Sequence, residues 1–203
     1  MTPYDEIIDL ALVSIEDYRI NRLATLVDDV NFDIISKSET YLDYVELCEQ
    51  NEVMPLREKD YNKIKIKNYT NYAEYTDDAL LELKSVMEGF MIRGLASFTN
   101  CKKDLSNRSD ELRVFNEPLT DLEKSIIADW AVISWLDKEI NDTRQITGMM
   151  QNKVEANRYS EANLLKEKTS HKVQLQEDVN KKQTEYDFLN IPWNDWARGE
   201  YGI

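Results

Sequence analysis

The sequence contains few of the residues that build tight turns and reactive sites. Its 203 residues include only 5 glycines, 4 prolines, 2 cysteines and 1 histidine. Scarce glycine argues against folds that depend on many tight turns or on phosphate-binding loops. Cys48 and Cys101 are too far apart in sequence for a CxxC pair and too few for a disulfide framework, so we expect two reduced thiols.

Long apolar runs and basic residues are scarce as well. No stretch approaches the roughly 18 apolar residues of a transmembrane helix, and the acidic start at Met1–Glu6 does not resemble a signal peptide. The chain has 39 acidic against 25 basic residues, a formal net charge of −14. Nucleic-acid clamps and polybasic membrane-surface proteins need a basic face, so both classes are disfavoured. Residues 1–60 hold most of the acidity, with 15 acids against 5 bases.

Four segments have the apolar spacing of amphipathic helices, and they predict a mainly α fold, a bundle of about four main helices. They cover approximately residues 3–17, 76–100, 120–141 and 160–189. Thr2 is the expected N-cap of the first helix, followed by Pro3 at its first position. The third begins with a capping box in which Thr120 and Glu123 exchange hydrogen bonds. Apolar residues cover more than half of that helix, so we expect it at the centre of the core.

The segments between these helices are less regular. Residues 18–52 are acidic and are predicted to be partly helical, and Leu112–Phe115 is predicted to be a brief strand, half of a hairpin. Lys63–Lys67 alternates lysine and isoleucine with a period of two, which predicts a short strand. Its lysines would protect an exposed sheet edge or, alternatively, form a basic patch for an acidic partner. A break is expected near Thr147–Gly148.

Catalytic and metal-binding motifs are not apparent in the sequence. His171 lies among lysines on the polar side of the last predicted helix, with no orienting partner in sequence, so we expect a surface residue. Asp29–Asp33 resembles the start of a calcium loop, but Ile34 and Thr40 replace the glycine and glutamate that such a loop needs. We therefore predict no enzymatic activity and no catalytic, metal-binding or cofactor-binding residue.

The C-terminal segment, residues 190–203, is rich in aromatic residues. Large aromatics are enriched at protein interfaces, and this segment has glycines and no regular pattern. We therefore favour a partner contact over the alternative that the segment folds back onto its own core. The candidate partner-binding residues are Trp193, Trp196, Tyr201 and Ile203.

Several stretches resemble the small head–tail connector proteins of tailed bacteriophages, also called adaptor or neck proteins. The resemblance covers about half of the chain. It lies in Tyr4–Leu10, Leu119–Lys124, Trp135-Leu136, Tyr159–Lys168 and Asn190–Trp193.

This resemblance implies an all-helical core with a small β element. It also implies a virion protein, assembled in the host cytoplasm, that forms a ring of twelve copies beneath the portal and extends the DNA channel. The partners would be the portal and the next neck or tail protein, with no specific DNA binding, no membrane and no cofactor. We expect one adaptor domain at residues 1–189, with an insertion at about 18–76 between the first two family-like helices. The tail 190–203 would contact the portal.

Two other classes remain open from sequence. An acidic host-takeover inhibitor that mimics DNA would use its carboxylates as a duplex-like surface. A small metal-dependent enzyme would use acid clusters as ligands. Virion mass spectrometry would separate the first from an adaptor, and metal-dependent thermal stabilisation would indicate the second.

Overall fold

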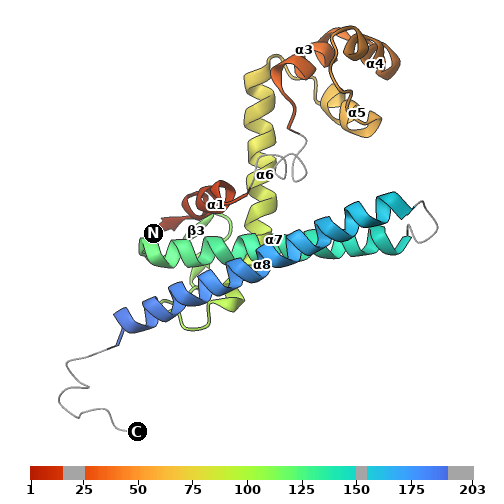
Figure 1. Cartoon of the computed structure of the whole chain (residues 1–203). Coiled ribbons are helices and arrows are strands. Elements are labelled where there is room, and N and C mark those ends of the chain that lie inside the picture. Colours follow the sequence, from red (N-terminus) through yellow and green to blue (C-terminus); the bar gives the residue numbers. More distant parts are fainter. Residues whose placement is uncertain (16–25, 150–154, 192–203) are drawn as a thin grey trace, which may run out of the picture. The chain divides into compact units, whose positions relative to one another are not determined.

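The computed structural model describes residues 1–15, 26–149 and 155–191, and the chain divides into two compact units (Figure 1). Unit 1 comprises Met1–Ser14 and Met87–Ile203, and unit 2 comprises Ile15–Val86. The fold is mainly helical, with one small three-stranded antiparallel sheet. The predicted fold class is thereby confirmed, whereas the single adaptor domain with an insertion stays a prediction.

Unit 1 is organised around helix α7 (Asp121–Met149). Helix α8 (Glu155–Leu189) lies beside α7 as its antiparallel partner, and α1 (Tyr4–Val13) also packs against α7. The predicted central position of this helix is correct, because its buried residues lie on several sides. They include Ile126, Ile127, Ala131, Val132, Trp135, Leu136 and Ile140.

The bounds of the last two helices differ from those predicted. Helix α7 continues through the predicted break at Thr147–Gly148 and reaches Met149. A lone glycine lowers helix stability by only about 1 kcal/mol, which is too little to end a long helix that packs along its length. Helix α8 begins at Glu155, before the predicted residue 160, and ends at Leu189 as predicted.

The small sheet joins the start of the chain to the connection before α7. Strand β1 (Thr2–Pro3) pairs with β3 (Val114–Phe115), which also pairs with β2 (Arg108–Ser109). The predicted strand and hairpin near residue 115 are confirmed. Thr2 is not a helix cap as predicted, since Pro3 is the N-cap residue of α1. The Thr2 hydroxyl instead accepts a hydrogen bond from the Leu119 backbone N–H at 2.7 Å.

Helix α6 (Tyr72–Gly94) begins four residues earlier than predicted and contributes residues to both units. Its unit 1 end is followed by a 3₁₀ turn, Leu95–Ser97. Gly94 passes so close to α7 that a Cβ atom there would lie 2.8 Å from the carbonyl carbon of Trp130. Glycine is therefore required at this crossing.

The described residues of unit 2 form three short helices and the first turns of α6. They are α3 (Asp29–Lys37), α4 (Tyr41–Gln50) and α5 (Glu58–Lys67). The strand predicted at Lys63–Lys67 is wrong, because these residues form the second half of α5. Side chains decide the difference: Ile64 is 5% exposed and Ile66 is 83% exposed, so the two isoleucines do not share a face.

The lysines of that segment make local contacts within unit 2. Two of them form ion pairs with acidic residues of α6: Lys63 pairs with Glu82 at 2.6 Å, and Lys67 pairs with Asp78 at 2.5 Å. Lys65 donates to the Ile35 carbonyl at 2.8 Å, at the end of α3, where the helix dipole favours a cation. The edge-strand interpretation is therefore wrong, whereas the basic patch for an acidic partner stays a prediction.

Tyrosines form much of the unit 2 core. Tyr44, Tyr61 and Tyr75 are almost fully buried, and their hydroxyls have hydrogen-bond partners. Tyr75 accepts from the Val27 backbone N–H at 2.9 Å, and burial raises its pKa to about 12. Tyr72 and Tyr75 both lie on α6.

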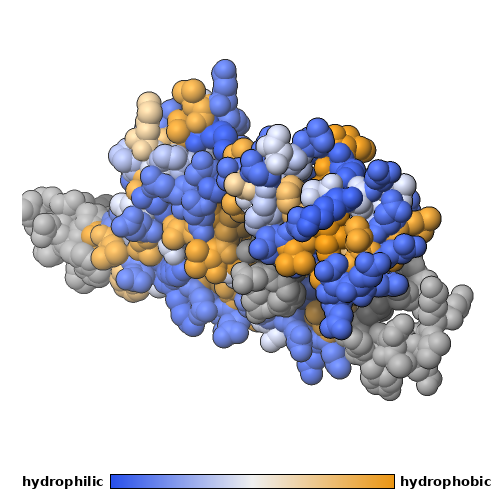
Figure 2. Space-filling model, turned by 90° about the horizontal axis from the view of Figure 1, so that it is seen from above, coloured by the Kyte–Doolittle hydropathy of each residue, from blue (hydrophilic) through white to orange (hydrophobic). Residues whose placement is uncertain are grey.

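Hydrophobic residues also reach the surface. On the face drawn in Figure 2, orange hydrophobic patches are separated by blue hydrophilic residues. Exposed large hydrophobics occur in both units, among them Val13, Leu42, Met54, Ile66, Leu112 and Leu189.

Candidate partner-binding region at the end of helix α8

The predicted partner-binding residues Trp193, Trp196, Tyr201 and Ile203 lie outside the described residues. The structure does describe the helix that leads to them. The last turns of α8 contact the connection between α6 and α7: Asn100 donates to the Asp187 carboxylate at 2.9 Å, and Gln183 donates to the Ser97 carbonyl at 3.2 Å. The end of α8 is therefore held in place.

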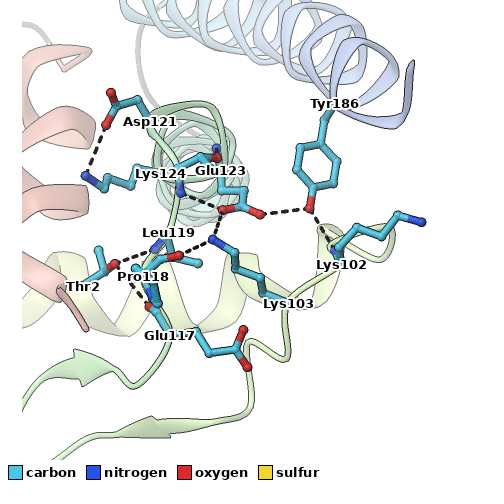
Figure 3. Close-up of polar contacts among 11 residues, drawn as sticks. Thr2, Lys102, Lys103, Glu117, Pro118, Leu119, Asp121, Glu123, Lys124 and Tyr186 are labelled. Carbon is cyan, nitrogen blue, oxygen red and sulfur yellow. Dashed lines mark hydrogen bonds and ion pairs between the residues drawn. The ribbon is translucent and has the colours of Figure 1, made fainter. Parts of the chain in front are cut away.

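Glu123 is the centre of this attachment (Figure 3). It is 2% exposed, and it accepts hydrogen bonds from the Thr120 backbone N–H at 2.7 Å and from the Tyr186 hydroxyl at 2.9 Å. Its carboxylate also pairs with the Lys103 ammonium at 2.9 Å. The capping box predicted for Thr120 and Glu123 is confirmed, since the Glu123 N–H donates to the Thr120 hydroxyl at 3.3 Å.

Tyr186 connects α8 to the rest of this network. Its hydroxyl accepts a hydrogen bond from the Lys102 backbone N–H at 2.9 Å while donating to Glu123. Its ring packs edge-on against Phe98, with centroids 5.2 Å apart. One side chain thus satisfies two polar groups and fills an apolar gap.

Burial and hydrogen bonding act in opposite directions on Glu123. Burial alone raises the pKa of this carboxyl, but the donors Thr120, Lys103 and Tyr186 outweigh burial and hold the pKa below its ordinary value. The pKa of Tyr186 is well above the ordinary tyrosine value, first because of burial and also because of the neighbouring Glu123 carboxylate. At neutral pH the pair is therefore an ionised carboxylate and a neutral phenol, which is the arrangement that the hydrogen bond requires.

Three lysines of α8 form ion pairs across the α7–α8 interface. Lys168 pairs with Glu139 at 2.9 Å, Lys172 with Asp137 at 2.5 Å, and Lys182 with Asp129 at 2.6 Å. Residues facing α7 recur at alternating spacings of three and four, as in a coiled-coil seam. They are Lys168, Lys172, Leu175, Val179, Lys182 and Tyr186. We call the three lysines and their carboxylate partners the lysine ladder.

Charge inside the seam has consequences for titration. Lys168 is 2% exposed, so its charge is removed from water and needs Glu139 and the Thr143 hydroxyl as partners. Burial raises the pKa of Asp129 above its ordinary value, although Lys182 opposes that effect. The sequence predicted that the lysines around His171 lie on the polar side of this helix. The three–four spacing was the signal that places them in the seam.

An open groove of about 540 Å³ lies toward the other end of the α7–α8 pair. It is lined mainly by apolar surface from one face of α8 and by one residue of α7. The lining residues are Arg144, Ala162, Leu165, Lys166, Thr169, Ser170 and Val173. We call it the α7–α8 groove.

The remaining candidates are the cysteines, the calcium-loop segment, and any metal-binding or membrane-spanning site. Cys48 and Cys101 form no disulfide, as predicted. Asp29 and Asn31 of the rejected calcium loop belong to helix α3. Across residues 1–15, 26–149 and 155–191, no group of three or more histidine, cysteine or acidic side chains is placed to hold a metal ion. None of the described helices combines the length and apolarity needed to cross a membrane.

Comparison with known proteins returned no match: no family model, no curated protein and no solved structure is similar to this chain.

Proposed function

We propose that this chain is a structural subunit of the head–tail junction of a tailed bacteriophage, forming a ring beneath the portal. The observation that carries the proposal is the architecture of unit 1. Helices α1, α7, α8 and the end of α6 form its helical core, and a three-stranded sheet accompanies them. An all-helical core with a small β element is what the resemblance to connector proteins implies.

The polar contacts of unit 1 fit a structural role. Its buried charges are paired with one another: Glu123 with Lys103, and Lys168 with Glu139. The second pair joins α8 to α7, and a buried pair of this kind favours one register of the two helices. A ring subunit must hold its interface surfaces in fixed positions, and a helix pair of defined register serves that need.

The charge distribution supports the adaptor over a DNA mimic. A mimic needs a continuous surface of uncompensated carboxylates, but several acids of unit 2 are neutralised by lysines. Examples are Asp33 with Lys37, Asp78 with Lys67, and Glu82 with Lys63. For a DNA conduit, a moderate excess of acid is enough, because it discourages phosphate binding within about 8–10 Å at physiological salt.

Assembly with the portal tests the proposal. The purified full-length chain is mixed with portal rings from the same virus, and the product is examined by native mass spectrometry and cryo-electron microscopy. We expect a cyclic complex with the chain on the tail side of the portal. Absence of any complex, together with absence of the chain from purified virions by mass spectrometry, would contradict the proposal and favour the inhibitor.

A further inference from the structure

The α7–α8 groove is lined by one side of α8 and by Arg144 of α7. Its α8 residues follow helical spacing at positions 162, 165, 166, 169, 170 and 173, which places them on one side of the helix. Val173 is 48% exposed, and Leu165 is half-buried at the base of this face. The groove therefore offers apolar surface that the described part of the chain leaves open.

The rim of the groove is basic. Arg144 and Lys166 line it together with two hydroxyl residues, and no acidic side chain is among the described lining residues. This is notable in a chain with a net charge of −14. Cations beside an apolar surface favour an aromatic occupant, through contact with the ring face, and a carboxylate close to it.

The chain itself contains a segment of that chemistry. Residues 193–201 include Trp193, Trp196 and Tyr201, with Asp195 and Glu200 between and beside them. The aromatics match the apolar surface, and the two carboxylates match Arg144 and Lys166.

The length of the chain decides whose groove the tryptophans reach. The middle of the groove, near residue 167, is 22 residues from Leu189, which is about 33 Å along a helix. The edge of the groove nearest to Leu189, at Val173, is about 24 Å from it. Trp193 follows Leu189 by four residues and extends at most about 14 Å. Trp196 extends at most about 24 Å, and only when fully stretched. A groove that takes both tryptophans must therefore belong to another copy.

We infer that Trp193 and Trp196 of one copy occupy the α7–α8 groove of a neighbouring copy. The inference rests on the proposed ring, and it makes the neighbouring subunit, in place of the portal, the partner of these two tryptophans. Tail and groove are different surfaces, so the contact is head-to-tail. Contacts of this kind repeat from copy to copy and close into a ring when the rotation allows.

Two full-length variants test the contact by complementation. Val173→Glu places a charge in the groove but keeps the tail, whereas Trp193→Ala/Trp196→Ala keeps the groove but removes the aromatic anchors. We expect each variant alone to be monomeric. Mixed together, they should form a 1:1 pair that cannot grow, because only one intact tail and one intact groove are present. Native mass spectrometry measures the stoichiometry of the mixed pair, and sedimentation of a labelled variant measures its affinity.

The controls make each outcome decisive. Leu42→Glu changes an exposed leucine of unit 2, 74% exposed, and should assemble like the unmodified chain. Thermal melts show whether each variant folds. We expect the double tryptophan variant to weaken self-association roughly 30-fold or more. A mixture that stays monomeric, or a double tryptophan variant that self-associates normally, overturns the inference.

Assembly on the portal separates this inference from the proposed function. A ring on the portal that persists in the double tryptophan variant overturns the tail–groove contact and leaves the adaptor proposal standing. A 1:1 mixed pair without any portal complex of the unmodified chain overturns the adaptor proposal alone.

Discussion

The hydroxyl of Tyr186 donates a hydrogen bond to the carboxylate of Glu123 at 2.9 Å, joining the end of α8 to the first turn of α7. These residues are 63 positions apart in sequence. The same carboxylate caps α7 and pairs with Lys103. One buried side chain thereby joins the first turn of α7 to the end of α8.

Removing the Glu123 charge should destabilise the protein. Glu123→Gln leaves the Lys103 ammonium without its buried partner, and we expect a loss of about 3 kcal/mol in the free energy of unfolding. Tyr186→Phe should cost less, about 1–2 kcal/mol, because it removes one hydrogen bond and keeps the ring. Urea denaturation measures both. Lys124→Ala is the control, because its partners Glu6 and Asp121 are half to fully exposed, and it should change stability less than either substitution.

The contribution of Glu123 should depend on pH. Its folded-state pKa is depressed, so its stabilisation is complete above the unfolded-state value of about 4.3 and disappears as the pH falls through the folded-state pKa. The stability difference between the unmodified chain and Glu123→Gln should therefore be constant from pH 7 to about 5 and shrink at lower pH. A difference that grows on acidification would show that the carboxyl is protonated in the native state.

Two glycines of α6 should respond in opposite ways to the same substitution. Gly94→Ala places a methyl group 2.8 Å from the Trp130 backbone, so α6 and α7 must separate, and we expect a loss of about 2 kcal/mol or more. Gly89→Ala meets nothing within 4 Å and should stabilise the helix by about 0.5–1 kcal/mol. Thermal melts of the two variants provide the comparison, and equal effects would contradict the close crossing at Gly94.

The lysine ladder should contain one costly position. Lys168→Ala removes a 2% exposed ammonium together with its ion pair to Glu139, whose side chain is only 15% exposed, and we expect a loss of about 3 kcal/mol. Lys181→Ala removes an exposed pair with Asp178 and should change stability far less than Lys168→Ala. Denaturation in low and high salt gives a further test, because the Lys168 effect should be the less sensitive to salt.

The two isoleucines of α5 distinguish a helix from a strand. In the structure Ile64 is buried and Ile66 is exposed, so Ile64→Ala should cost about 2–4 kcal/mol and Ile66→Ala close to nothing. A strand with lysines on one face would make both isoleucines equally costly. Unfolding of the two variants therefore also tests the interpretation that the sequence pattern first favoured.

Several local signals in the sequence were reliable, although the expected helix cap at Thr2 was not. The Thr120–Glu123 capping box, the apolar circumference of α7 and the strand near Phe115 were all predicted. The period-two alternation over five residues wrongly predicted a strand. The same pattern fits a short helix when α6 supplies a partner for Lys63 and α3 supplies one for Lys65. Tertiary contact, not intrinsic preference, decided that segment.

Long-range pairing was the part that sequence could not give. Nothing near Glu123 indicates that Lys103 and Tyr186 will reach it, and nothing near Thr2 indicates a strand that pairs with Phe115. Such contacts depend on how helices cross, and Gly94 shows that a single missing side chain controls one crossing. The candidate tail residues were nominated by composition alone, whereas the groove needed the folded α7–α8 pair.

Helix α6 has a consequence for how the protein folds. The boundary between the two units, after Val86, falls inside this continuous helix and not in a linker. Helix formation is cooperative, so unwinding that starts at Tyr72 can propagate past Val86 toward the crossing at Gly94. We therefore expect the unfolding transitions of the two units to be linked thermodynamically. Hydrogen exchange along α6 would then rise and fall as one block on both sides of the boundary.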